Sequence, residues 1–446
     1  MSDSMIIVFV LLAVFVPTAG ARFGHLSVIS LFVYAQATMA AGTLPALDPA
    51  LEADVVHASV ILWSFGTLVG VSVLYAFTIL KSPRTAYDPL VDFAYPKRTT
   101  AFWILASIGI STLYYMSVGY LAFVESLQAL INDTGEDVAA LRLESYAGEK
   151  YFFPGYVNQF KNALLPALTI VVLTSAYHFR VSGRAVVGLI LAPLTLLFLL
   201  GTGQRGAFVI ALALAVVTAY FVVPRRVKKY IVRIGIVGIL LFFLLTIASG
   251  RANRDLEAAP DFGSKLGVLF EQLAFRILGS NQMSSIVGFQ YIHEQDIPAG
   301  SEWWQAFVGL LPGQPGSDLS NRIFAVLYGS TRGTSPLSLW GSTYHNWGLV
   351  GTVLIAALLA TIFCRLAASI NSTTYGNLVQ FVGMAGVTIT LGTWIADGPV
   401  SVLNKGLVMY ALVWLWGSRI ARRGQSAVLG GTDSAVGHPR RSMPRE

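Results

Sequence analysis

The 446-residue sequence is 55% hydrophobic and only 12% charged, with a mean hydropathy of +0.65. An ordinary soluble domain has roughly 25% charged residues, so this composition excludes a soluble globular protein and indicates a polytopic membrane protein. The net charge of +7 does not indicate nucleic-acid binding, because the basic residues cluster in short loops between apolar runs. The single cysteine, Cys364, excludes an internal disulfide and a thiolate metal cluster.

Apolar runs long enough to cross a bilayer recur along the chain. Eleven candidate spans begin near residues 5, 26, 58, 101, 163, 185, 206, 231, 340, 378 and 403. No basic residue precedes the first run, so we expect a membrane span there rather than a signal peptide. The expected fold class is an all-α polytopic membrane protein with about eleven transmembrane helices, its bundle covering residues 1–423.

Most lysines and arginines fall in one alternating set of short loops and in the segment after residue 418. The positive-inside rule assigns those segments to the cytoplasm, so we expect the N-terminus outside and the C-terminus inside. Residues 424–446 are polar, glycine-rich and basic, which predicts a disordered cytoplasmic tail.

This orientation leaves two long segments outside, residues 126–162 and 250–339. A connection of about ninety residues normally carries function or a folded subdomain. Within it, apolar residues recur at helical spacing from Phe262 to Ile277. This periodicity predicts an amphipathic helix that lies along the membrane surface or packs under the loop's own core.

Residues 201–223, GTGQRGAFVIALALAVVTAYFVV, combine glycines, one arginine and an uninterrupted apolar helix. Gly201, Gly203 and Gly206 have the spacing of the dinucleotide fingerprint, but a membrane helix precedes them where that fingerprint requires a strand, so we reject a dinucleotide site. Arg205 begins the apolar run, a costly position unless an anion or carboxylate meets it. We expect Arg205 and the helix-start N–H groups to bind phosphate; snorkelling to the interface is the alternative.

Three further arginines lie in the long outer loop. Arg251 and Arg254 share one helical face, where they either bind a pyrophosphate or pair with the acidic residues that follow. Arg276, inside the amphipathic stretch, either joins the same anion site or is a solvated ion-pair partner. Bidentate guanidinium contacts suit a ligand with two or more negative charges, so we expect these arginines to help bind a diphosphate.

The span near residue 340 opens with GSTYHNWGLVG. His345 and Asn346 stand where the helix enters the membrane from outside, and Gly348 and Gly351 allow a helix or a lipid to approach closely. A histidine can take a proton near neutral pH, so His345 is a candidate for activating a sugar hydroxyl, with Asn346 binding substrate. The alternative is an interfacial histidine bonded to a neighbour.

Metal sites are weakly indicated. The six histidines are scattered without metal-ligand spacing. Glu52 and Asp54 could hold Mg²⁺ or Mn²⁺, but two carboxylates near a membrane surface are more often solvated. We therefore expect no metal site, and the lack of a phosphate-binding G-x-x-x-x-G-K-[ST] gives no indication of ATP-driven transport.

Three features together resemble the O-antigen polymerase (Wzy) family of oligosaccharide repeat-unit polymerases. TGQRG at the start of a span is similar to the family's T-G-x-R-G, and YHNWGLVG is similar to its Y-x-N-F-G-x-x-G. The third is the long outer loop late in the chain, with AFRILG and LLPG. The resemblance covers roughly residues 200–360.

The resemblance implies a GT-C-like membrane glycosyltransferase whose extracytoplasmic loop is partly helical. It would transfer a growing glycan from undecaprenyl pyrophosphate onto another lipid-linked repeat unit at the outer face of the inner membrane. Its partners would be lipid-linked oligosaccharides, membrane lipid and a chain-length regulator, with no cofactor or nucleotide sugar. Arg205 would bind pyrophosphate with help from Arg276, whereas His345 falls at the variable position of its motif.

Other functions stay open from the residues alone. A transporter or flippase for lipid-linked oligosaccharides often has two similar halves, and none is visible here. A scaffold of a glycan-assembly complex, an O-antigen ligase and a metal-dependent transferase using Glu52 and Asp54 are further alternatives. Related ligases place a histidine and asparagine before a longer gap to the glycines, which favours a polymerase.

Overall fold

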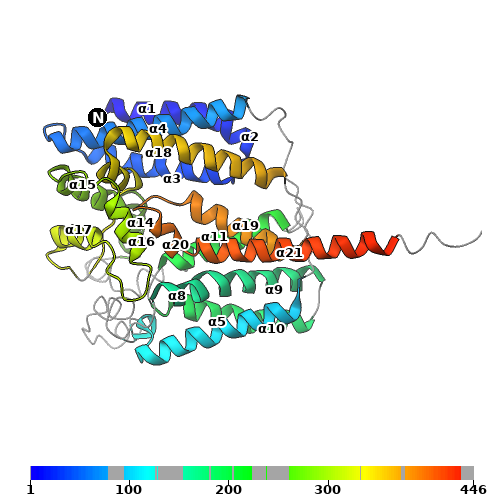
Figure 1. The fold of residues 1–446 in the computed structure, drawn as a ribbon. Coiled ribbons are helices and arrows are strands. Elements are labelled where there is room, and N and C mark those ends of the chain that lie inside the picture. The colour runs from blue at the N-terminus through cyan, green and yellow to red at the C-terminus, as the bar shows by residue number, and fades with distance from the viewer. Residues whose placement is uncertain are drawn as a thin grey trace, which may run out of the picture.

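The computed structural model describes residues 2–78, 95–125, 128, 154–179, 182–202, 205–222, 238, 261–331, 333–372 and 377–432. Long helices lie side by side, and the last one projects from one end of the bundle (Figure 1). Within the described ranges, strand-like pairing is limited to one antiparallel bridge between Ser338 and Ala396. The predicted all-α fold class is therefore confirmed.

One half of the bundle surrounds a core formed by the N-terminal helices and a long helix from later in the chain. Its elements are α1 (Ser2–Phe15), η1 (Val16–Gly20), α2 (Ala21–Phe23), α3 (Val28–Thr43), η2 (Leu44–Ala46), α4 (Glu52–Thr78) and α18 (Leu339–Ser372). The ring centroid of buried Phe32 lies 4.9 Å from that of Phe363 and 6.1 Å from that of Trp340. Both contacts are edge-to-face, which aromatic quadrupoles favour, so they hold α18 against α3.

The other half surrounds a second core. Its elements are α5 (Lys97–Val118), α8 (Pro154–Asn158), η3 (Gln159–Leu164), α9 (Leu165–Phe179), α10 (Ser182–Leu200), α11 (Arg205–Val222), α19 (Leu378–Gly392), α20 (Val400–Asn404) and α21 (Leu407–Thr432). A Cβ added at Gly383 would lie 2.3 Å from the amide nitrogen of Trp414, and one at Gly417 would lie 2.3 Å from that of Gln380. These glycines therefore let the backbones of α19 and α21 touch, as small residues do between membrane helices.

Six described helices are long and apolar enough to cross a membrane: Asp3–Phe23, Val28–Ala46, Glu52–Thr78, Lys97–Val118, Gly155–Tyr177 and Leu339–Asn371. Shorter apolar helices are Ala185–Leu200, Gly206–Phe221, Leu378–Gly392 and Leu407–Ala421. The predicted spans coincide with these helices, except that the one near residue 231 lies outside the described residues. Large apolar side chains such as Leu105, Leu189 and Leu354 point outward, as contact with lipid requires.

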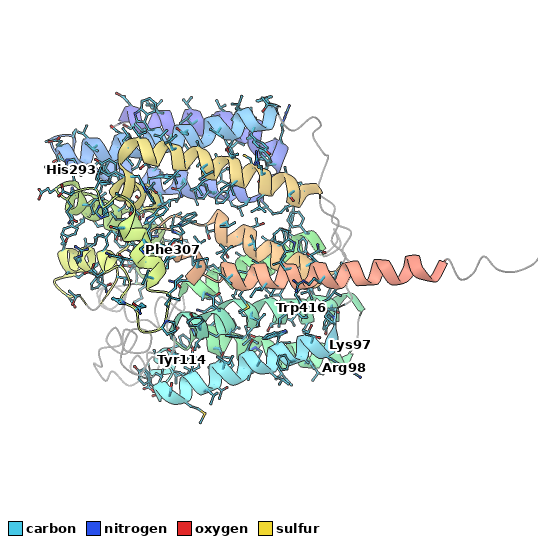
Figure 2. All side chains as sticks on the ribbon, viewed as in Figure 1. Lys97, Arg98, Tyr114, His293, Phe307 and Trp416 are labelled. Carbon is cyan, nitrogen blue, oxygen red and sulfur yellow. The ribbon has the colours of Figure 1, made fainter. Side chains whose placement is uncertain are left out.

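The two ends of the bundle differ. At one end, which we call the loop end, gather α14 (Phe262–Leu278), α15 (Ser280–His293), α16 (Ser301–Val308) and α17 (Leu319–Tyr328) (Figure 1). The opposite end, the tail end, carries Lys97, Arg98 and the projecting part of α21, as Figure 2 shows. Lys97, Arg98 and the end of α21, which were predicted to share one side of the membrane, therefore lie at the same end of the bundle.

The amphipathic helix predicted from Phe262 is α14. The side chain of Asp261 caps its start by accepting a hydrogen bond from the Ser264 N–H at 2.8 Å. The helix packs on α3 and α15, and a Cβ at Gly42 of α3 would lie 2.2 Å from the carbonyl oxygen of Leu278. Phe270 and Phe275 nevertheless stay exposed, as a helix lying at the membrane surface requires.

The C-terminal boundary differs from the prediction. We expected disorder from Gly424, but α21 continues as a helix to Thr432 (Figure 1). The predicted boundary therefore lies inside the last helix, and the remainder of the predicted tail lies outside the described residues.

Candidate functional site

A cavity of ≈ 1530 Å³ lies at the loop end of the bundle, between α8, η3, the start of α11, α16, the α19–α21 connection and the start of α21. Its ionisable and amide side chains include Glu302, Asp397, Lys405, Asn158, Gln159 and Asn404. Ile210, Val408 and Met409 add apolar wall from α11 and α21. Drug-sized ligands occupy pockets of roughly 300–1,000 Å³, so this cavity suits a larger ligand with polar and apolar parts.

The connection between α19 and α20 forms one wall of the cavity. It is not helical, and Asp397 has a positive φ of 55°. Hydrogen bonds fix its path: the Asp397 N–H donates to the Leu337 carbonyl at 2.9 Å, and the Gln36 side chain donates to the Trp394 carbonyl at 2.7 Å. Irregular backbone is tolerated in a membrane protein where it is buried in protein or lines a cavity, and this connection does both.

Asp397 lies in this connection, and Lys405 follows α20, so both ionisable groups lie between α19 and α21. Burial and the negative charge of Glu302 raise the pKa of Asp397 to about 7, while Lys405 and a backbone hydrogen bond from Leu337 oppose that shift. Burial also lowers the pKa of Lys405, against the charge of Asp397. The cavity therefore holds a carboxyl group that exchanges protons near neutral pH and a cation within electrostatic range of it.

Glu302 of α16 is occupied by hydrogen bonds. Its Oε1 accepts from the Ser317 hydroxyl at 2.7 Å, and its Oε2 accepts from Asn346 Nδ2 at 3.0 Å. The indole N–H of Trp303 donates to the Ser342 hydroxyl at 2.8 Å, which adds a second link between α16 and α18. These contacts hold Glu302 as part of the cavity wall.

Asn346 is fully buried, and the interactions of its side chain are with the protein rather than the cavity. Its Nδ2 also donates to the Ser342 carbonyl at 2.9 Å, and its Oδ1 accepts from the backbone N–H of Trp303 at 3.3 Å. His345 is 7% exposed and is not among the described residues that line the cavity. The structure thus makes Asn346 a positioning residue and does not bring His345 to the ligand space.

Gly348 breaks α18 two residues after Asn346. Its φ of 65° and ψ of −171° fall in a region essentially restricted to glycine. We predicted that Gly348 and Gly351 allow close approach of another helix or a lipid. Gly348 also forms a backbone kink, and a Cβ there would lie 3.3 Å from Ile297 Cδ1, so a neighbour does approach it closely. A Cβ at Gly351 would lie 2.3 Å from the Cβ of Trp347, one turn earlier in the same chain.

Arg205 is the first residue of α11, and the next two residues, Gly206 and Ala207, line the cavity. The backbone of Arg205 therefore lies at the cavity edge, while its side chain is outside the described part. The helix α10 precedes the glycines, which confirms the rejection of a dinucleotide site. Gly201 has a packing role, because its added Cβ would lie 2.5 Å from the Tyr115 hydroxyl oxygen.

None of the other predicted arginines is among the described residues that line the cavity. Arg276 lies in α14, and none of the described side chains of that helix lines the cavity. The side chain of Arg276 itself is outside the described part, and Arg251 and Arg254 lie wholly outside it. Their predicted anion-binding roles stay predictions.

Lys161 is a buried cation that the sequence analysis missed. It is 0% exposed in η3, and its Nζ donates to Asn162 Oδ1 at 3.1 Å and to the Thr202 hydroxyl at 3.4 Å. The ring centroid of Tyr114 lies 6.0 Å from the same nitrogen. Lys161 therefore ties η3 to the turn before α11. The sequence signal was a lone lysine beside an apolar run.

Comparison with known proteins adds no relative. A scan against protein-family models, a search among curated proteins and a search among solved structures each give no match. The residues around the cavity are therefore the features that indicate a function.

The Glu52–Asp54 alternative for a metal is disfavoured by the hydrogen bonds of Asp54. Its Oδ1 accepts from the Gln290 side chain at 2.9 Å, and its Oδ2 accepts from the Asp48 N–H at 2.8 Å. Both oxygens thus have a structural role: Oδ1 links α4 to α15, and Oδ2 fixes the segment that precedes α4. Among the described residues, no group of three or more histidine, cysteine, aspartate and glutamate side chains could hold a metal ion.

Proposed function

We propose that this protein is a membrane glycosyltransferase that polymerises lipid-pyrophosphate-linked oligosaccharide repeat units. The observation that carries the proposal is the cavity, in which ionisable and amide groups at the loop end adjoin apolar walls on α11 and α21. A lipid-linked oligosaccharide has the same division, because its sugars and phosphates are polar and its polyprenyl chain is apolar. The resemblance of residues 200–360 to O-antigen polymerases points the same way.

The cations suit a diphosphate. Lys405 lines the cavity, and Arg205 begins the helix whose next two residues line it. Pyrophosphate is a good leaving group, so the protein must mainly stabilise the charge that develops as the sugar–phosphate bond breaks. Charge-assisted contacts from lysine and arginine provide that stabilisation, and they require no metal ion.

The remaining lining suits sugars. Amide side chains such as Asn158, Gln159 and Asn404 offer both donors and acceptors to hydroxyl groups. Trp303 and Tyr156 present large rings with a polar atom at one edge, which can cover an apolar sugar face. The proposed ligand therefore has a matching group for each kind of lining residue.

The finer features belong to the same proposal. The fold would be GT-C-like with eleven spans, in the inner membrane, with the N-terminus outside and the C-terminus cytoplasmic. Support comes from the tail end of the bundle, which carries Lys97 and Arg98 and from which α21 projects. The positive-inside rule assigns such an end to the cytoplasm, so the cavity would open to the outer side.

The test is chain-length analysis of surface glycans in cells carrying single variants. Arg205→Ala should lower polymerisation about ten- to a hundredfold, because one charge-assisted phosphate contact contributes roughly 1.5–3 kcal/mol. Long chains should disappear while single repeats remain. Arg419→Ala, an exposed arginine farther along α21 from the cavity-lining residues, is the matched control and should leave the ladder unchanged.

Other outcomes identify the rival functions. Loss of every repeat from the surface in Arg205→Ala cells would indicate a flippase or a ligase. An unchanged ladder in Arg205→Ala, Arg276→Ala and His345→Ala cells would indicate a scaffold. Purified protein that converts extracted lipid-linked single repeats into longer chains, with no other protein present, would establish polymerase activity directly.

A further inference from the structure

We propose that Asp397 is the general base that accepts the proton of the acceptor sugar hydroxyl. This inference rests on the proposed function and replaces His345 in the role that the sequence suggested. It depends on three observations: where Asp397 lies, which groups its carboxylate already contacts, and which charges act on it.

The position of Asp397 is fixed by the backbone before any ligand binds. It lines the cavity with a φ of 55°, a region where aspartate, asparagine and glycine are tolerated better than other residues. Leu339 N donates to the Ile395 carbonyl at 3.0 Å, and a Cβ at the neighbouring Gly398 would lie 2.7 Å from the indole nitrogen of Trp303. The connection is thus pinned between α16 and α18.

The two carboxylates of the cavity differ in their availability. Both oxygens of Glu302 accept hydrogen bonds from side chains, Ser317 and Asn346. Asp397 has the backbone hydrogen bond from Leu337 and no side-chain hydrogen bond within the described part of the chain. A carboxylate with unused lone pairs at a cavity wall can accept a proton from a ligand, whereas Glu302 would first have to release its partners.

Two described ionisable groups act on Asp397. Glu302 approaches it from α16, and Lys405 from the end of the same connection. With burial, their balance brings the pKa of Asp397 to about 7, which is suited to proton transfer near neutral pH. His345 is not placed to contact a ligand, because it is buried and absent from the described cavity lining.

The transfer step breaks two bonds and forms two. The acceptor O–H bond breaks, and its proton passes to a carboxylate oxygen of Asp397. The oxygen lone pair forms the new bond to the anomeric carbon of the donor sugar. The bond from that carbon to the pyrophosphate oxygen breaks, and its electron pair leaves on the diphosphate, opposite Lys405 and Arg205. Direct attack predicts inversion at the anomeric carbon, and a retained configuration would contradict it.

The experiment uses the purified full-length protein with lipid-pyrophosphate-linked repeat units extracted from cells that lack it. Asp397→Asn keeps a residue that tolerates the positive φ but removes the base, so its initial rate should fall about 10²- to 10⁴-fold. Asp318→Asn, at an exposed aspartate paired with Arg322 at 2.9 Å, is the matched control and should keep the parent rate.

A second variant separates catalysis from a structural effect. Asp397→Gly also suits the backbone and leaves space for a small carboxylate, so added formate should restore part of its activity. The acid limb of the pH–rate profile, expected near pH 7 for the parent, should be missing from the residual activity of Asp397→Asn. A rate reduction without formate rescue and with an unchanged acid limb would overturn the proposal.

Failure of this inference is distinguishable from failure of the proposed function. If the parent protein forms chains and Asp397→Asn does so within about threefold, against the hundredfold minimum expected of a general base, only the base assignment is wrong. If the parent protein forms no chains from the extracted repeat units, the proposed function itself is wrong.

Discussion

Two carboxylates near the loop end, the buried Asp54 and the half-buried Asp397, show how the two halves of the bundle differ. In the N-terminal half, Asp54 is 2% exposed, and both of its oxygens accept hydrogen bonds, from Gln290 and from the Asp48 backbone. In the cavity, Asp397 has no side-chain donor among the described residues. Asp54 is explained by the fold alone, because the protein pairs both of its oxygens, whereas the Asp397 carboxylate has no side-chain partner there and lines a cavity that a ligand can fill.

The largest expected effect is on stability, when each of these two carboxylates is removed in turn. Asp54→Ala removes two hydrogen bonds to a charged group and should lower the free energy of unfolding by about 3 kcal/mol. Asp397→Asn should change it by less than about 1 kcal/mol, because no side-chain partner is lost. Thermal unfolding in detergent measures both. Equal destabilisation by the two variants would contradict the distinction between them.

The kink in α18 tests whether the cavity wall can be moved without disturbing the N-terminal half. Gly348→Ala puts a side chain where φ is 65° and should cost about 1–3 kcal/mol. It should also weaken the Asn346–Glu302 contact, which lies just before the kink, and so reduce activity. The control is Gly66→Ala in α4, where the nearest atom to an added Cβ is 4.0 Å away and the helix should gain up to about 1 kcal/mol.

Two charge variants test the role of Asp397 as a base through the pH dependence of the rate. The base must be deprotonated, so activity should be lost as pH falls through the pKa of Asp397, about 7. Lys405→Met removes the charge that lowers this pKa and should move the acid limb upward by about one unit. Glu302→Gln removes the charge that raises it and should move the limb downward. Shifts in the same direction would contradict the assignment.

The smallest effect concerns Lys161, a buried charge on the cavity side of the bundle whose donors are partly satisfied. Replacing a buried charge by an apolar side chain of similar length is often neutral, so Lys161→Met should change the free energy of unfolding by less than about 1 kcal/mol. Lys161→Arg, which puts a larger cation in the same closed space, is the comparison. A large loss in Lys161→Met alone would show that the charge itself stabilises the turn at Thr202.

Much of the helix arrangement could be predicted from the sequence. The positions of the apolar helices follow from hydropathy, because a helix surrounded by lipid needs an uninterrupted apolar run. The helix α14 follows from its periodicity and from Asp261, which caps it. The location of Arg205 at the start of α11 was also predicted, because the glycines and the arginine precede the apolar run.

The candidate site could be predicted only in part. Glu302 and Asn346 are 44 residues apart, and nothing in the sequence pairs them before the fold brings α16 against α18. Asp397 lies in TWIADGPV without a recognisable motif, and its significance depends on a positive φ that the sequence does not reveal. The prediction for His345 used its residue type and its place at the start of a span, and neither shows whether the side chain reaches the cavity, whose described lining does not include it.

The backbone contact between α19 and α21 has a consequence for how a sugar would bind. Gly383 and Gly417 let α19 pack directly on α21, and the connection that carries Asp397 runs between these two helices, so their packing limits how far its ends can move apart. The entropic cost of ordering Asp397 therefore belongs to folding, and it does not reduce the affinity for a glycan. An acceptor sugar that binds there contacts an ordered backbone, so the flexible carbohydrate must adopt the reactive conformation.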